Sequence, residues 1–338
     1  MEFCLRTIEH DRLFVLVDEN TQQGCLPLLQ ETGLIENAGL IVIPSGEINK
    51  SIDTLTKVWT YLSRHEATRK SLLLNLGGGL LTDLGGFAAA TFKRGMHFVN
   101  IPTTLLSMVD AAVGGKTGIN FLGLKNEIGA FAPADVVLIE TGFLKTLSHE
   151  NFLSGYAEML KHALISSDKN WLDILAFNLD EIDYNILTSL LVTSVGIKEK
   201  IVEEDPKEKG VRKALNLGHT IGHAIESYCI ETGNPVMHGY AVAWGIVCEL
   251  YLSFMKLNFD KQKLIKTAHF IKENYGSFVF DCKIYDHLYE LMQHDKKNEN
   301  SGSINFTLLK DIGDIKINRT ASKEEIFEAF DFYRELLN

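Results

Sequence analysis

The sequence predicts a two-domain protein, with a doubly wound, mostly parallel α/β sheet domain first and a mainly α-helical domain second. Its 338 residues exceed the roughly 100–200 residues of one ordinary domain. Up to about residue 140, short β-rich runs alternate with helical patterns, and after about residue 147 long segments follow the helical period. We therefore expect domains at 1–146 and 147–338.

Five short apolar runs predict the strands of the first domain. Each is rich in aliphatic residues and is followed by a polar or turn-forming segment. They are LFVLVD (13–18), LIVIP (40–44), SLLLNL (71–76), HFVNIP (97–102) and VVLIE (136–140). Strands that alternate with helices predict a mostly parallel sheet.

The second domain is predicted to be helical with one hairpin. Residues 151–167 and 186–204 have helical periodicity, whereas 303–317 alternates apolar and polar residues around a glycine-containing turn. The chain has no internal repeat and no linker rich in Pro or Ser, so we expect the domains to share an interface with a ligand cleft.

The composition indicates a folded cytoplasmic protein without a membrane span. Apolar residues make up 46% and charged residues 23% of the chain, as in soluble globular proteins. The longest uncharged stretch, 232–248, contains Pro235, His238 and three glycines, and falls short of the roughly 20 apolar residues that a span needs. The N-terminus carries charges where a signal peptide would be apolar.

The net charge and the cysteines exclude further classes. A formal charge of -11 disfavours general binding to nucleic acid or anionic membranes, although a small anionic substrate remains compatible with it. The five cysteines are widely spaced and form no Cys-x-x-Cys pair, which predicts reduced core thiols. They are Cys4, Cys25, Cys229, Cys248 and Cys282.

The strongest local signal is the glycine-rich segment 75–83. A glycine triplet between an apolar strand and a helix lets backbone N–H groups approach a diphosphate at the helix N-terminus. It is not a strict dinucleotide fingerprint, because Thr82 stands where the third glycine belongs and the acidic Asp18 precedes the glycines. A tight turn without a ligand is the alternative.

The segment Gly114-Gly115-Lys116-Thr117 resembles a phosphate-binding P-loop but fails its spacing. Asp110 stands where that motif needs its first glycine, and no strand is expected immediately before it. Asp110, Lys116, Lys125 and Asn126 remain as groups that suit hydroxyls and a phosphate. Taken as isolated residues, they are more typical of a solvated loop.

Two groups in the helical domain carry possible metal chemistry. Glu158, Lys161 and His162 share a helix face, a pattern that surface ion pairs also produce. His219 and His223 are one turn apart. Two imidazoles and a carboxylate suit Zn²⁺ or Fe²⁺, and histidines hydrogen-bonded within a helix pair are the alternative.

Seven motifs together resemble the 3-dehydroquinate synthase family, over nearly the whole chain and in the family's order. They are GGGLLTDLGGFAAATFKRG, IPTTLLSMVDAAVGGKTGIN, GLKNEIGAF, GYAEMLKHALI, LNLGHTIGHAIE, MHG and DKKN. The resemblance implies a Rossmann-like NAD-binding domain, a helical metal-binding domain, and a homodimer.

The resemblance also implies the role of each matching residue. Its metal ligands, for Zn²⁺ or another divalent cation such as Co²⁺, would be Glu158, His219 and His238, which corrects the spacing argument because His223 would then face substrate. NAD would be bound by Asp18, Asn20, Glu47, Lys50, Gly78, Gly79, Asp83, Thr103, Thr104, Lys125, Thr146 and Leu147. Substrate would be bound by Asp110, Lys116, Asn126, Lys161, Lys198, Glu208, Arg212, Asn216, His223 and Lys296, with Arg94 contributed by the other subunit.

One position departs from the family pattern. Where the family usually reads His-Gly-Glu, this chain reads His238-Gly239-Tyr240. A phenol forms hydrogen bonds but does not supply a carboxylate charge, so a glutamate that tunes the metal from outside its ligand shell would be missing here.

The implied reaction converts 3-deoxy-D-arabino-heptulosonate 7-phosphate into 3-dehydroquinate and phosphate. It combines transient oxidation by NAD, β-elimination of phosphate, re-reduction and aldol closure. Three rivals are another sugar phosphate cyclase, a metal-dependent NAD alcohol dehydrogenase and a non-catalytic nucleotide-binding protein. The numerous cations of the implied substrate set favour the synthase.

Overall fold

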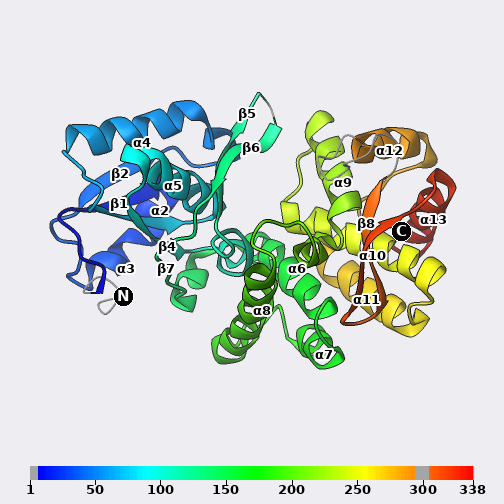
Figure 1. The fold of residues 1–338 in the computed structure, drawn as a ribbon. Coiled ribbons are helices and arrows are strands. Elements are labelled where there is room, and N and C mark those ends of the chain that lie inside the picture. Colours follow the sequence, from blue (N-terminus) through cyan, green and yellow to red (C-terminus); the bar gives the residue numbers. More distant parts are fainter. Residues whose placement is uncertain (1–6, 123, 294–303, 338) are drawn as a thin grey trace. The chain divides into compact units, whose positions relative to one another are not determined.

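The computed structural model describes residues 7–122, 124–293 and 304–337 and divides the chain into two compact units. The first unit is Met1–Ser148 and the second is His149–Asn338. Figure 1 shows the sheet in the first and the helices of the second.

The first unit contains a parallel five-stranded sheet in the order β2-β1-β3-β4-β7. Its strands are β1 (Leu13–Asp18), β2 (Gly39–Ile43), β3 (Leu72–Gly77), β4 (His97–Pro102) and β7 (Val136–Val137). All five predicted runs form strands, and the α/β fold class is confirmed. The last strand is shorter than predicted, because the Glu140 side chain accepts the N–H of Gly142 at 3.0 Å and starts a helical turn, Thr141–Thr146.

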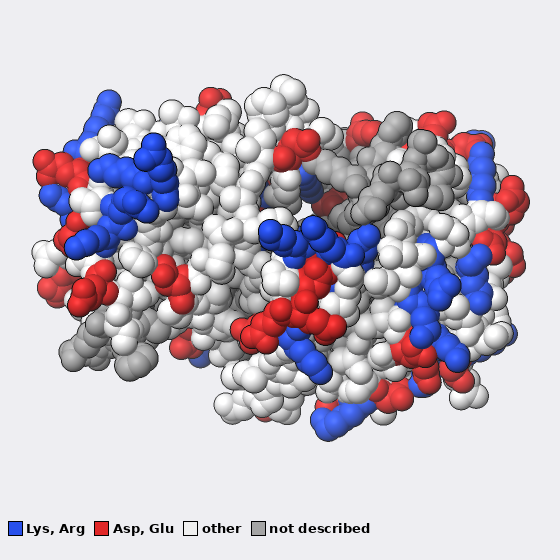
Figure 2. Space-filling model, in the orientation of Figure 1, with Lys and Arg blue, Asp and Glu red and all other residues white. Residues whose placement is uncertain are grey.

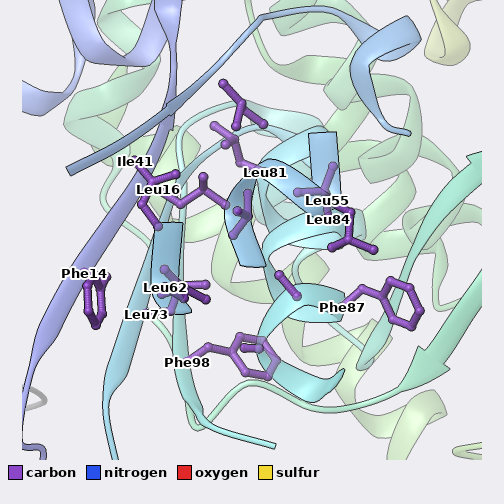
Figure 3. Packing of buried hydrophobic residues seen from close by; sticks show 14 of the residues in the cluster. Phe14, Leu16, Ile41, Leu55, Leu62, Leu73, Leu81, Leu84, Phe87 and Phe98 are labelled. Carbon is purple, nitrogen blue, oxygen red and sulfur yellow. The ribbon is translucent and has the colours of Figure 1, made fainter. Parts of the chain in front are cut away.

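Helices connect these strands and complete the core of the first unit. They are α2 (Glu19–Gly24), α3 (Leu26–Gln30), α4 (Ile52–Arg64) and α5 (Gly79–Thr91), with short helical turns at Glu47–Asn49, Phe92–Arg94 and Ser107–Ala111. Leu55 of α4 and Leu84 of α5 pack with Leu16 of β1 in one buried cluster (Figure 3). Each such fully buried side chain contributes about 1.5–3 kcal/mol relative to exposure.

A second sheet of the first unit was not predicted. Strands β5 (Lys116–Phe121) and β6 (Leu124–Phe131) pair antiparallel, so the expectation of a solvated loop is wrong for this segment. Thr117, Gly118 and Ile119 are buried, and Ile119 joins the core cluster. The glycines of the segment interrupt the alternation of polar and apolar residues that would indicate a strand.

The second unit is helical, as predicted. Its helices are α6 (His149–Leu164), α7 (Asp168–Ala176), α8 (Tyr184–Glu204), α9 (His219–Glu231), α10 (His238–Leu257), α11 (Lys261–Tyr275), α12 (Tyr285–Gln293) and α13 (Lys323–Leu337), with helical turns at Val211–Asn216 and Cys282–Ile284. The side chain of Asp183 caps α8 by accepting the N–H of Asn185 at 2.8 Å. The predicted hairpin is also present, as β8 (Asn305–Asp311) and β9 (Asp314–Thr320).

Helix α10 is the central helix of the second unit. It packs against α6, α9, α11, α13 and β8, and is therefore apolar on most of its circumference. By length and composition it is the one described helix that could cross a membrane, but 67% of the relevant window is buried inside the protein. The uncharged stretch 232–248 is too short to indicate a membrane span. The charged Glu249 ends that stretch, whereas the helix continues to Leu257. This burial is typical of a core helix.

Charged residues of both signs are present on the surface in view. Figure 2 shows groups of Lys and Arg alternating with groups of Asp and Glu.

Three of the described cysteines, Cys25, Cys229 and Cys248, are buried free thiols. Cys282 is exposed in a helical turn, so the prediction of a core thiol is wrong for this residue. Cys4 lies outside the described residues.

Candidate active site and metal centre

In the first unit, predicted NAD residues lie at the carboxyl ends of neighbouring strands. Asp18 ends β1, Gly77 ends β3, and Thr103 follows β4. Leu16 pairs with Asn75, and Gly77 with Pro102, so these strand ends are adjacent. In open α/β sheets, ligands bind at this edge.

The glycine-rich turn connects β3 directly to α5. Gly78 is the N-cap residue and Gly79 the first residue of the helix, as the sequence pattern predicted. Thr103 donates its N–H to the Gly77 carbonyl at 3.1 Å, and a Cβ on Gly78 would lie 3.2 Å from Thr104 Cγ2. A helix N-terminus of this kind favours a phosphate group.

Lys50, Asp83 and Asn126 form a compact polar cluster. The buried Lys50 Nζ donates to Asp83 Oδ2 and to Asn126 Oδ1, both at 2.5 Å. Burial raises the pKa of Asp83, although the charge of Lys50 opposes this shift. The cluster thus joins two predicted NAD residues to a predicted substrate residue.

Asn120 is a residue of this cluster that the sequence reasoning missed. Its Oδ1 accepts the N–H of Asn126 at 2.8 Å, its Nδ2 donates to Glu47 Oε1 at 2.9 Å, and its N–H donates to the Lys50 carbonyl at 2.8 Å. Asn126 has a left-handed φ of 51°. The position of Asn120 at the end of the GGKTGIN motif was the available signal.

The other predicted residues of the first unit are exposed or half-buried. The charge of one of them, Asp110, contributes to the raised pKa of Asp83. Asn20, Lys116 and Lys125 are exposed, and Asp110 is half-buried in the turn Ser107–Ala111. The hydroxyl of Thr146 donates to the Phe143 carbonyl at 2.8 Å and lies 3.8 Å from Cys25 Sγ, next to the half-buried Leu147. Arg94 is exposed in a strained turn, where it has a φ of 67°.

In the second unit, Glu158 lies fully buried on α6. Its carboxylate forms an ion pair with Lys161 one turn later, which is also buried. Burial alone would raise the pKa of Glu158, but the charges of Lys161 and His219 hold it well below its ordinary value. Both carboxylate oxygens of Glu158 are buried, and their neighbours are the side chains of Lys161, His219 and His238.

His219 and His238 approach this carboxylate from α9 and α10. Glu158 Oε1 lies 3.4 Å from His219 Nε2 and 3.5 Å from His238 Nε2. Ligands at about 2.0–2.1 Å from a tetrahedral Zn²⁺ are about 3.3–3.4 Å apart from one another. The spacing of these three groups is compatible with one metal ion held between them.

His223 completes a cluster of three imidazoles. Ligand nitrogens of His219, His223 and His238 lie within 4.8 Å of one another. Burial lowers the pKa of His238, but hydrogen bonds to Glu158 and Glu226, and their charges, raise it to about 9. Glu226 was missed by the sequence reasoning, although it lies two turns after His219 on the same face of α9.

Close packing brings His238 to Glu158. A Cβ on Gly239 would lie 1.9 Å from the Ser154 carbonyl oxygen of α6, so only glycine permits this approach. The N–H of Gly239 donates to Ser154 Oγ at 3.1 Å. The adjacent Tyr240 packs its ring against Tyr275, with centroids 5.3 Å apart.

Three of the predicted substrate residues of the second unit, Glu208, Arg212 and Asn216, lie in the segment between α8 and α9. Asp205 organises this loop by accepting the N–H groups of Lys209, Gly210 and Arg212 at 3.0, 2.7 and 3.1 Å. Arg212 is buried and donates to the Pro206 carbonyl at 2.8 Å.

The loop also brings two further predicted residues together. Asn216 Nδ2 donates to Glu208 Oε1 at 3.4 Å. Lys198 is buried on α8, which leads into the loop. Lys296 lies outside the described residues.

Two family models match consecutive parts of the chain. The 3-dehydroquinate synthase N-terminal model matches residues 40–154, and the 3-dehydroquinate synthase C-terminal model matches residues 155–298. The 3-dehydroquinate synthase of Parabacteroides distasonis is 55% identical over 331 residues, 98% of this chain and 94% of that protein. The Clostridium tetani enzyme of the same name is 35% identical over 95% of this chain and 86% of that protein.

Solved structures share the fold at lower sequence identity. A 2-epi-5-epi-valiolone synthase from Streptomyces hygroscopicus, with NAD⁺ and Zn²⁺ bound, has a TM-score of 0.85 at 24% identity and covers 98% of this chain and 92% of its own. A 2-deoxy-scyllo-inosose synthase with NAD⁺ and Co²⁺ has a TM-score of 0.84 at 22% identity, with 98% and 92% coverage. An iron-containing alcohol dehydrogenase from Thermotoga maritima has a TM-score of 0.65 at 17% identity, with 99% and 93% coverage.

Proposed function

This chain belongs to the 3-dehydroquinate synthase family, and we propose that it converts 3-deoxy-D-arabino-heptulosonate 7-phosphate into 3-dehydroquinate and phosphate. The enzyme is a phosphate-eliminating lyase of the shikimate pathway, which leads to chorismate and the aromatic amino acids. The observation that carries the proposal is 55% identity to a curated synthase over 98% of the chain.

The two units provide different parts of the chemistry. We assign NAD binding to residues 1–146, through the glycine-rich turn and the strand ends around it, and metal binding to residues 147–338, through Glu158, His219 and His238. When bound, NAD supplies a reversible hydride acceptor and a divalent metal such as Zn²⁺ or Co²⁺ polarises the substrate hydroxyl.

Cationic and amide side chains orient the substrate and stabilise the leaving phosphate. In the first unit this role falls to Lys116 and Asn126, with Asp110 as a partner for hydroxyl groups. In the second unit this role falls to the buried side chains of Lys198 and Arg212, whose positive charges suit an anionic ligand. The remaining substrate residues in the proposal are Lys161, Asn216 and Lys296.

Two protein groups are suited to moving protons. His223 is half-buried beside the proposed metal ligands, and an imidazole can both accept and donate a proton. Glu208 lies on the loop that Asp205 organises and accepts a hydrogen bond from Asn216. The departing phosphate is a third acceptor for these steps.

We further propose that the enzyme acts in the cytoplasm as a homodimer, with Arg94 serving the phosphate site of the other subunit. The exposed Arg94 follows Lys93 and precedes Gly95 in a run of three positive φ values, 49°, 67° and 116°. Such strained conformations persist where the surrounding structure requires them and cluster at functional sites.

A stopped-flow experiment distinguishes the synthase from an alcohol dehydrogenase. With the heptulosonate phosphate, Zn²⁺ and less than one equivalent of NAD⁺, nicotinamide absorbance should rise and then fall while phosphate accumulates over many turnovers. A dehydrogenase would instead convert the added NAD⁺ to NADH that persists, then stop, and release little phosphate, and that result would overturn the proposed function.

A further inference from the structure

We infer that Glu226 is a positioning residue that fixes the ring of His238 for metal binding and supplies the carboxylate charge that Tyr240 does not. The inference rests on the metal centre of the proposed function and concerns a residue outside the ligand set. It follows from the hydrogen-bond partners of Nδ1 in His219 and His238.

Both histidines present Nε2 to Glu158, and when a metal binds Nε2 the ring proton is left on Nδ1. Nδ1–H of His219 donates to the Leu217 carbonyl at 3.1 Å. Nδ1–H of His238 donates to Glu226 Oε2 at 3.3 Å. Hydrogen bonds of this kind fix the tautomer and the ring orientation of a metal-binding histidine.

The two histidines differ in how far packing alone restrains them. The side chain of His219 is 10% exposed, whereas that of His238 is 27% exposed at the first residue of α10. The side chain of Glu226 is only 9% exposed. His238 therefore depends more on its hydrogen bond, and its partner is held firmly on the neighbouring helix.

A carboxylate partner does more than a backbone carbonyl. Its negative charge raises the basicity of the imidazole and so strengthens the bond to a metal. The family pattern would provide a glutamate at position 240, but Tyr240 packs against the rings of Tyr275 and Trp244, with centroids 5.3 and 6.1 Å away. Among the described residues, Glu226 is the carboxylate that contacts His238 Nδ1.

The test measures Zn²⁺ affinity of the metal-free protein by competition with a chromophoric chelator. Glu226→Gln keeps an acceptor oxygen but removes the charge, and Glu226→Ala removes both. We expect affinity to fall about 10-fold in the first and about 100-fold in the second. The visible spectrum of the Co²⁺-loaded protein should change in the same order, which a merely structural role would not produce.

Glu231→Gln is the matched control. Glu231 lies on the same helix and also contacts a histidine, His287, at 2.7 Å, but both side chains are about half exposed and neither belongs to the metal site. This variant should bind Zn²⁺ as the wild type does. Thermal unfolding of each metal-free variant checks that the fold is intact, and if Glu226→Ala unfolds, the isosteric Gln variant decides.

The outcomes separate this inference from the proposed function. If the wild type binds Zn²⁺ tightly but folded Glu226 variants bind it within threefold of wild type with an unchanged Co²⁺ spectrum, Glu226 has no positioning role. If the wild type itself fails to bind Zn²⁺ or Co²⁺, the metal centre of the proposed function is overturned.

Discussion

Glu249 should be a main contributor to the stability of the second unit. This fully buried carboxylate of α10 accepts three backbone N–H groups at the start of α9, from Gly218 at 2.6 Å, Thr220 at 3.0 Å and Ile221 at 3.2 Å. It therefore satisfies helix-terminal donors that no residue within α9 can reach, and fixes the helix that carries His219.

The substitution Glu249→Gln tests this with almost no change in volume. An amide oxygen can still accept two of the N–H groups, but its NH₂ then faces the third donor. A hydrogen bond to a charged group contributes about 1.5–3 kcal/mol, so losing one bond and the charge on the others should cost about 3 kcal/mol. This corresponds to a fall in melting temperature of about 6–12 °C for a unit of this size. Glu249→Ala, which leaves three donors unpaired, should cost about 5 kcal/mol.

Urea unfolding of the metal-free protein measures the change. A Trp59→Phe background leaves Trp171 and Trp244, both in the second unit, as the fluorescent reporters. Glu231→Gln on the exposed face of α9 serves as the control and should leave the free energy of unfolding unchanged. If Glu249→Gln unfolds within about 0.5 kcal/mol of wild type, the reasoning from buried hydrogen bonds is wrong.

Three further experiments test the metal centre and the dimer. Glu158→Gln keeps the size but removes the charge, so metal analysis should show much weaker retention, and unchanged metal content would contradict the ligand assignment. Gly239→Ala would press a methyl group against the Ser154 carbonyl. The substitution should therefore destabilise the second unit by about 2 kcal/mol and weaken Zn²⁺ binding. A melting temperature equal to that of the wild type would argue against the close approach of the two helices. Mixing the inactive variants Arg94→Ala and Lys116→Ala under subunit exchange should restore part of the activity, and the shared site is excluded if exchange occurs without recovery.

Much of the fold could be predicted because the signals are local. Apolar runs such as 13–18 and 97–102 have the length and composition of buried strands, and their alternation with helices predicts a parallel sheet. The hairpin β5–β6 escaped because its glycines interrupt the alternation and its burial depends on packing beneath α5. Helix α10 was underestimated because the charged Glu249 in its middle ended the uncharged stretch at residue 248.

The sequence by itself determined which chemistry is available. The order of the motifs identifies the family without reference to any distance, and the resemblance implies Glu158, His219 and His238 as a ligand set of the type that binds zinc.

Only the tertiary structure decided which groups meet. Lys50 contacts Asp83 and Asn126, which are 33 and 76 positions away, and Glu249 reaches the first turn of α9 from another helix. Side chains this far apart in the chain are brought together by the packing of whole elements, which local periodicity does not encode. For the same reason, the carboxylate beside His238 comes from Glu226 on α9, and Tyr240, its neighbour in sequence, packs among aromatic rings instead.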